Sequence, residues 1–143
     1  MITESREKDL LLKSWYDFRT TLEIVPDPIK ATTSYFLSKP RVKIYTDPYD
    51  QSTWPTPWEL ITENEYCPFN LLLGICYTLQ LTERFKDISP QIAIAVDSKS
   101  KTVYYLLLVE ENVFGYLEDE WTTVQKLPKS LKMQKIFNMV PLH

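Results

Sequence analysis

The chain has 143 residues, 44% of them hydrophobic and 13% aromatic, and a formal net charge of −3 at pH 7. This length and apolar content suit one domain with a single core, and the slight acidity disfavours nucleic acid or an anionic membrane as partners bound through bulk charge. The polar start MITESREKD differs from a secretory signal, and no stretch approaches the roughly 18 apolar residues of a membrane span. We therefore expect a protein that is not exported by a signal peptide.

Two helices are expected first. Between residues 5 and 22 apolar side chains recur at spacings of three and four, which gives a helix one apolar face. A second helix is expected over residues 28–37, because Asp27 can cap its free N–H groups and Pro28 suits its first turn. The apolar face of the first helix comprises Leu10, Leu11, Trp15, Phe18 and Leu22.

Two further helix starts follow. Thr56, Pro57 and Glu59 form a capping-box pattern, which predicts a short helix to about residue 62. The next segment, ENEYCPFNLLLGICYTLQL, is mostly apolar and has a helical period. We expect it to form the central buried helix, with Cys67 at its N-cap directly before Pro68.

The two cysteines are expected to be free thiols. Cys67 and Cys76 are nine residues apart in one predicted helix, which separates them by about 13 Å, beyond the reach of a disulfide. The sequence has a single histidine, His143, and no CxxC or HExxH pattern. We therefore expect no metal site and no cofactor.

The last third of the sequence predicts strands. Four runs rich in β-branched and aromatic residues are separated by short polar turns, as in an antiparallel meander. Helices followed by a meander give an α+β fold, with the central cysteine-bearing helix packed on the sheet. We expect one domain over residues 1–128 and a basic C-terminal tail over residues 129–143. The predicted strands cover residues 92–96, 102–109, 113–117 and 121–124.

The segment WPTPWELITENEYCPFNLLLGICYTLQL resembles a signature of the bacterial transglutaminase-like cysteine proteinases, which have a papain-like α+β fold. That signature reads W-x-T-P-x-E-x-L, a spacer, and then Gly-Asp-Cys-Glu-Asp. Further on, YYLLLVEENVFGYLEDEW resembles the family's two strands that carry a histidine and an aspartate. The resemblance implies a catalytic triad of cysteine, histidine and aspartate.

Placed on this sequence, the triad positions fall on Cys67, Tyr104 and Glu118. A tyrosine, with an ordinary pKa near 10, is protonated at neutral pH and cannot act as the acid and base that histidine supplies. The only histidine, His143, is the final residue. The resemblance therefore implies a degenerate member with vestigial positions and no expected catalytic residue.

Charge separates along the C-terminal part of the chain. Residues 110–120 carry five acids and no base, and residues 126–143 carry four lysines and no acid. Apolar residues lie among the lysines, which is typical of a segment that docks on a partner. The acids are Glu110, Glu111, Glu118, Asp119 and Glu120, and the expected partner-binding residues are Lys126, Lys129, Lys132, Lys135, Ile136 and Met139.

The preferred hypothesis is a non-catalytic transglutaminase-like domain that acts as a structural or assembly module. Its expected partners are other protein subunits, in a homo-oligomer or a larger assembly such as a phage virion, so the expected location is the cytoplasm or the virion. One alternative is a thiol hydrolase or peptidase with Cys67 as nucleophile. Another is a peptide-binding module that uses a vestigial cleft.

Overall fold

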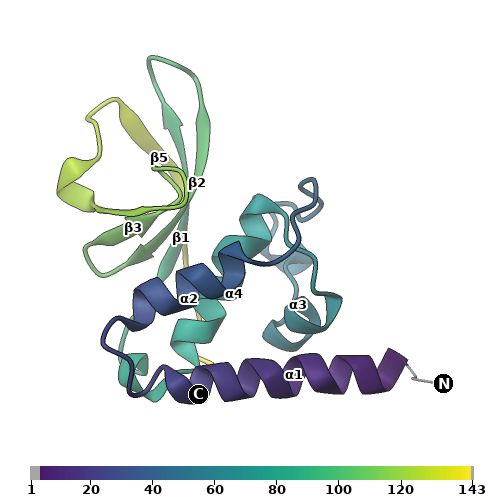
Figure 1. Cartoon of the computed structure of the whole chain (residues 1–143). Helices are drawn as coiled ribbons and strands as arrows, with labels where there is room; N and C mark the ends of the chain where they lie inside the picture. Colours follow the sequence, from purple (N-terminus) through teal and green to yellow (C-terminus); the bar gives the residue numbers. More distant parts are fainter. Residues whose placement is uncertain (1–3, 143) are drawn as a thin grey trace. The chain divides into compact units, whose positions relative to one another are not determined.

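A computed structural model describes residues 4–142 of the chain. The chain divides into two compact units, one up to Lys86 and one from Asp87 on. The first is helical and the second is an antiparallel sheet (Figure 1). The predicted mixture of helices followed by an antiparallel sheet is therefore confirmed. The predicted packing of the central helix on the sheet stays a prediction.

The described part of the first unit, from residue 4 on, contains four α-helices at the places the sequence predicts. The helix α4 is its centre, because nearly every residue of α4 is buried, and both α2 and α3 contact it. The Trp15 side chain of α1 donates from Nε1 to the Thr78 hydroxyl of α4 at 3.0 Å. The helices are α1 (Glu4–Thr21), α2 (Pro28–Leu37), α3 (Pro57–Glu63) and α4 (Pro68–Gln80), with short 3-10 turns η1 (Gln51–Thr53) and η2 (Glu83–Phe85).

The expected caps start these helices. The Asp27 carboxylate accepts the Lys30 N–H at 3.1 Å at the start of α2. At the start of α3, the Thr56 hydroxyl accepts the Glu59 N–H at 3.2 Å, and the Glu59 carboxylate accepts the Thr56 N–H at 3.0 Å. This reciprocal pair satisfies two N–H groups that a helix start leaves without intrahelical partners.

Close contact between α2 and α4 depends on Gly74. A Cβ at this position would lie 2.6 Å from Cε1 of Phe36, a ring that is fully buried. Since non-bonded carbon atoms pack at about 3.5–4.0 Å, a larger side chain would force the two helices apart.

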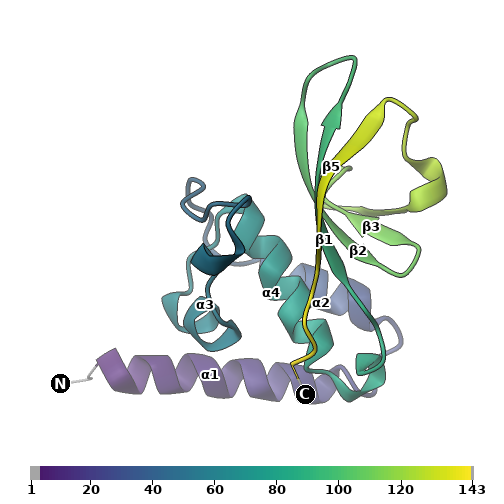
Figure 2. The ribbon, with the colours of Figure 1, turned by 180° about the vertical axis from the view of Figure 1, so that it is seen from behind.

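The second unit is a five-stranded sheet with the order β4-β3-β2-β1-β5, in which all neighbours are antiparallel (Figure 2). Its first four strands overlap the four predicted runs and form the predicted meander. The strands are β1 (Gln91–Asp97), β2 (Val103–Val109), β3 (Asn112–Phe114), β4 (Trp121–Thr123) and β5 (Leu131–Asn138), and η3 (Val124–Lys126) precedes β5.

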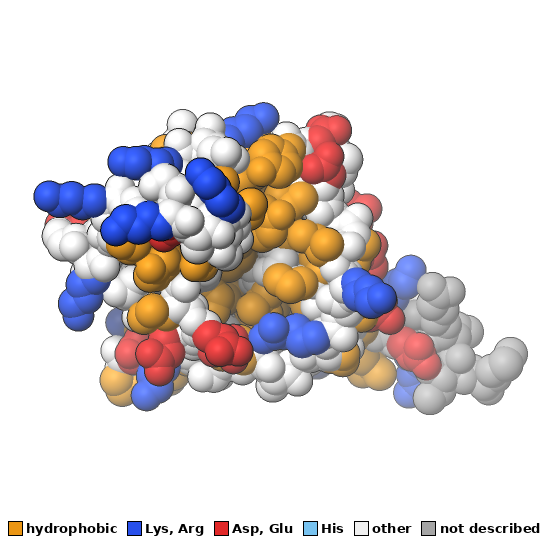
Figure 3. Space-filling view, turned by 90° about the horizontal axis from the view of Figure 1, so that it is seen from above, with side chains coloured by type: hydrophobic (Ala, Val, Ile, Leu, Met, Phe, Trp, Pro, Cys, Tyr) orange, Lys and Arg blue, Asp and Glu red, His pale blue; other side chains and the backbone are white. Residues whose placement is uncertain are grey.

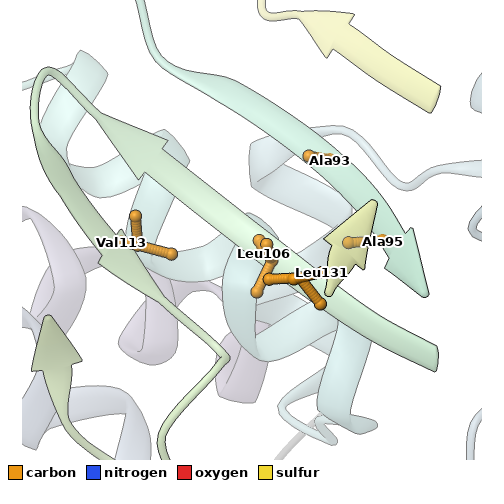
Figure 4. Packing of buried hydrophobic residues seen from close by; sticks show 5 residues of the cluster. All are labelled: Ala93, Ala95, Leu106, Val113 and Leu131. Atoms are coloured by element: carbon orange, nitrogen blue, oxygen red, sulfur yellow. The ribbon is translucent and has the colours of Figure 1, made fainter. Parts of the chain in front are cut away.

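One side of this sheet carries a small apolar core. Five buried side chains meet there, from β1, β2, β3 and β5 (Figure 4). The chain leaves β3 through Gly115, whose φ of 110° and close approach to the Tyr105 carbonyl leave no room for a Cβ. The buried members of this apolar core are Ala93, Ala95, Leu106, Val113 and Leu131, and Tyr104, Leu108, Tyr116 and Leu127 pack against them.

The C-terminal segment differs from the sequence prediction. The expected basic tail over 129–143 instead contains β5, which pairs along β1 and forms an edge of the sheet. Leu131 is buried in the core, and the Met139 N–H donates to the Pro90 carbonyl at 3.0 Å. Because most of this segment is bound into the sheet, it is not a free docking peptide.

Candidate functional site

Cys67 is the N-cap of α4, as the sequence predicts. Its backbone is extended, with φ −74° and ψ 164°, and Pro68 occupies the first helical turn. The sulfur accepts the Asn70 N–H at 3.4 Å, and the Cys67 side chain is fully buried. The thiol therefore serves as a helix cap that is shielded from solvent.

The residues before Cys67 are held by an earlier part of the chain. The Tyr66 N–H donates to the Pro40 carbonyl at 3.1 Å, and the Val42 N–H donates to the Tyr66 carbonyl at 3.1 Å. These two bonds form an isolated parallel bridge between Arg41 and Tyr66. They bring the segment after residue 42 next to the start of α4.

Tyr45 lies in that segment and completes the surroundings of the cysteine. Its hydroxyl accepts from the Asn70 Nδ2 at 2.8 Å and donates to the Glu65 carbonyl at 3.1 Å. Burial raises the pKa of Tyr45, and negative charge on Glu63 or Cys67 raises it further. This hydroxyl is therefore a neutral donor at physiological pH and not a base.

Two residues that adjoin Cys67, its chain neighbour Tyr66 and its cap partner Asn70, each have a buried polar atom with no hydrogen-bond partner within residues 4–142. The two atoms are the Oδ1 of Asn70 and the hydroxyl of Tyr66. Burial also raises the pKa of Tyr66 well above its ordinary value, so this phenol also stays neutral. The Cys67 thiol is thus buried while the Tyr45 side chain above the same helix start is 52% exposed, and the neutral hydroxyls of Tyr45 and Tyr66 are not bases.

The other cysteine has no sign of reactivity. Cys76 is fully buried within α4, and its thiol lies 3.6 Å from the Gln80 side-chain oxygen. Burial strongly raises the pKa of Cys76, which keeps it a neutral thiol. Both cysteines are free, as expected from their spacing.

The remaining triad positions belong to the second unit. Tyr104 is half-buried in β2, where it packs on the core and its ring centroid lies 5.1 Å from that of Tyr116. Glu118 is exposed in the connection between β3 and β4 and not on a strand. Their expected proximity to Cys67 stays a prediction, and His143 lies outside the described residues.

The expected partner-binding residues lie on β5 or beside it. Lys132, Lys135 and Ile136 are exposed on the strand itself, and Ile136 retains 48% of its accessible surface. Lys126 and Lys129 are exposed in the segment before β5. Met139 follows the strand and is half-buried. The structure thus places Lys132, Lys135 and Ile136 on the edge strand β5 and Met139 just after it, whereas Lys126 and Lys129 lie in the connection from β4 to β5.

Sequence reasoning missed Tyr45 and Asn70. They are 25 residues apart, and no local pattern joins them. One signal was present: Asn70 is the only amide within an otherwise apolar run at the start of α4. A buried carboxamide requires partners, so it predicts a polar group from elsewhere in the chain.

Within the described residues, no group of three or more His, Cys, Asp or Glu side chains is placed to hold a metal ion. No helix in residues 4–142 combines the length and apolar character needed to cross a membrane.

No family model and no curated protein sequence matches the chain. Solved structures of LapG from Legionella pneumophila do match it. The calcium-bound LapG is 17% identical, over 96% of this chain and 84% of LapG, with a TM-score of 0.65. A second LapG structure is 18% identical, over 96% and 83% of the two chains, with a TM-score of 0.64. At this identity the likeness shows the fold, and the chain therefore has the mixed helix and antiparallel-sheet architecture of LapG, a transglutaminase-like fold.

Proposed function

We propose that the chain is a non-catalytic protein with a transglutaminase-like fold that acts as a structural or assembly module for other protein subunits. The observation that carries this proposal is the absence of a suitable histidine. The sequence contains one, His143, and the position that the resemblance assigns to the catalytic histidine holds Tyr104. Without an imidazole beside it, a thiol lacks the group that activates it and protonates the leaving group.

The contacts of Cys67 support the same proposal. Its sulfur is enclosed and caps α4, whereas a nucleophile must reach a substrate carbonyl. The Tyr45 hydroxyl near it stays protonated and is already bonded to Asn70 and Glu65. The groups around the thiol stabilise the start of the helix and supply no base.

In the proposed role, the functional residues lie on the surface of the protein and not in a catalytic cleft. The partners are protein subunits, in a homo-oligomer or a larger assembly. Membership of a phage virion is an expectation that rests only on a small chain rich in aromatic residues and poor in glycine. Detection of the chain in purified virus particles would test it.

A second candidate is a thiol hydrolase or peptidase with Cys67 as nucleophile. One observation favours it: Cys67 lies at the N-terminus of α4, the place to which the resemblance assigns the nucleophile. The use of a vestigial cleft to bind peptides is a third possibility, and no contact described above favours it over the first.

Hydrolysis of labelled casein by the wild type, Cys67→Ala and the matched control Cys76→Ala separates these candidates. The proposal expects no turnover by any of the three. It also expects iodoacetamide to modify Cys67 in the native chain far more slowly than in the urea-unfolded chain, because the thiol is buried. Turnover that Cys67→Ala abolishes and Cys76→Ala preserves would overturn the proposal and establish the thiol hydrolase.

A further inference from the structure

Arg19, in the last turn of α1, carries a guanidinium that aromatic rings hold in place. Its Cζ lies 4.4 Å from the centroid of the Trp15 ring and 5.5 Å from that of the Tyr16 ring. Basic side chains that extend into solvent, such as the group at the left of Figure 3, are screened by water and salt and contribute little to binding. A guanidinium that is already oriented loses less entropy when it binds.

No carboxylate pairs with Arg19 within residues 4–142. The two acids nearest to it in the chain are already bound. The Asp17 carboxylate accepts a hydrogen bond from the Lys13 ammonium at 3.1 Å, and the Glu23 carboxylate accepts two backbone N–H groups of η2 at 2.9 and 3.1 Å. The Nε of Arg19 is buried and has no hydrogen-bond partner among the described residues. The guanidinium is thus partly desolvated without a counter-ion, which a carboxylate from another molecule would supply.

Exposed aromatic side chains adjoin this guanidinium. The buried Trp15 ring packs edge-on against the ring of Trp58 in α3, with their centroids 5.6 Å apart. Contacts therefore run from Trp58 through Trp15 and Arg19 to Tyr16. Trp58 retains 52% of its accessible surface and Tyr16 retains 60%. We define Tyr16, Arg19 and Trp58 as the Arg19 surface. It consists of the three residue types that contribute most binding energy at protein contacts.

A single carboxylate suits this surface better than a polyanion does. Nucleic acid requires several cations along a stripe, because its affinity comes from many phosphate contacts. Here one guanidinium lies on helices that also carry exposed acids, Asp17 on α1 and Glu59 and Glu63 on α3. The exposed rings favour a carboxylate with apolar side chains next to it, as in an acidic segment of a protein.

We propose that the Arg19 surface binds an acidic residue, flanked by apolar residues, in a segment of a partner protein subunit. This inference rests on the proposed assembly role and names the chemistry of the partner. The partner's carboxylate pairs with the outer nitrogens of Arg19 in the bidentate geometry that a guanidinium offers. The rings of Tyr16 and Trp58 pack on the apolar side chains beside it.

Selection of short random peptides from a yeast-displayed library tests this binding on the full chain. Selected peptides are expected to share an aspartate or glutamate next to an aromatic or aliphatic residue. Each is then synthesised with its acid and with the corresponding amide, and fluorescence anisotropy measures both affinities. The amide form tests the pairing on the wild type itself, so this result does not depend on how well a variant folds.

The amide peptide, Arg19→Gln and Trp58→Ala are each expected to weaken binding by about tenfold or more, because each removes the charge pair or an aromatic contact. Arg19→Lys keeps the charge and loses the planar fork, so an intermediate affinity is expected. The controls are Arg6→Gln, at an exposed arginine of the same helix, and Tyr49→Ala, at an exposed aromatic of the same unit. Both should bind like the wild type, and circular dichroism checks that each variant is folded.

Three results would overturn the inference: selected peptides without an enriched acid, acidic peptides whose affinity Arg19→Gln leaves unchanged, or a labelled single-stranded oligonucleotide that binds the Arg19 surface more tightly than the peptides do. The last would assign the surface to nucleic acid. None of these results bears on casein turnover, which tests the proposed lack of catalysis separately. A chain without turnover that binds no acidic peptide would therefore reject this surface and leave the non-catalytic role standing.

Discussion

At the residue scale, Asn70 joins the two polar groups nearest the start of α4. Its N–H donates to the Cys67 sulfur at 3.4 Å, and its side-chain amide donates to the Tyr45 hydroxyl at 2.8 Å. Sulfur is a weak acceptor, so the cap contributes little energy by itself. The bond to Tyr45 is the stronger of the two. It fixes the side chain of Asn70, the residue whose backbone N–H the cysteine sulfur accepts.

Replacement of Tyr45 by phenylalanine is expected to destabilise the chain. The variant leaves the buried Asn70 amide without its acceptor and removes the bond to the Glu65 carbonyl, so we expect a loss of about 1–3 kcal/mol in the free energy of unfolding. Urea denaturation measures this loss. Tyr16→Phe is the matched control, because Tyr16 is 60% exposed and Tyr45 is 52% exposed, so the comparison isolates the bonds of the Tyr45 hydroxyl. Equal unfolding midpoints for the two variants would show that the bond to Asn70 contributes nothing measurable.

Only the local part of this arrangement could be predicted from the sequence. Proline after Cys67 and the apolar run that follows are sufficient to place the cysteine at a helix start. The contact with Tyr45 depends on the bridge between Arg41 and Tyr66, which joins distant segments through backbone groups of ordinary residues. No composition or spacing encodes such a bridge.

At the element scale, helix starts and the meander were predictable, and β5 was not. The caps at Asp27 and Thr56 act within four residues, so the sequence shows them directly. In β5 the register shift places Met133 and Ile136 on one side at a spacing of three. A strand is recognised by alternation with a period of two, and the shift removes that pattern.

The turn between β1 and β2 gives a prediction about pH. The Asp97 carboxylate accepts the Ser100 N–H at 3.1 Å and the Lys99 N–H at 2.8 Å, and the Ser130 hydroxyl donates to it at 3.1 Å just before β5. These bonds lower the pKa of Asp97. A lowered pKa means that the stabilisation is complete above the ordinary aspartate value of about 4 and is lost as pH falls through the folded-state value.

The free energy of unfolding of the wild type should therefore fall more steeply on acidification below about pH 4 than that of Asp97→Asn, which cannot ionise. Thermal or urea unfolding across that range measures the difference. Asp87→Asn, at an exposed position in the same unit, is the control and should keep the slope of the wild type. Parallel curves for the wild type and Asp97→Asn would refute the role of the Asp97 charge.

At the scale of the whole molecule, the chain has the same architecture as LapG although few residues are identical. It shares 17% identity with calcium-bound LapG at a TM-score of 0.65. What the sequence predicts of the fold of this chain is the helix caps, the cysteine at a helix start and the meander, all of which are patterns of residue type. Such patterns persist when individual side chains change, because they require only an apolar period, a capping group or a turn. These patterns do not depend on the residue type at any single position, so the likeness of fold does not decide which residue stands at position 104.

The last prediction concerns the C-terminal segment, which the sequence alone suggests could be removed without loss of the core. A chain that ends at Pro128 loses β5, exposes the edge of β1 and removes Leu131 from the core, and we expect its free energy of unfolding to fall by at least about 3 kcal/mol. A chain that ends at Met139 keeps β5 and the bond from Met139 to Pro90, and it should match the full chain. Urea denaturation, with hydrogen exchange at β1, compares the three. If the chain that ends at Pro128 kept full stability and lost only self-association, β5 would be a detachable docking segment and not a structural strand of the sheet.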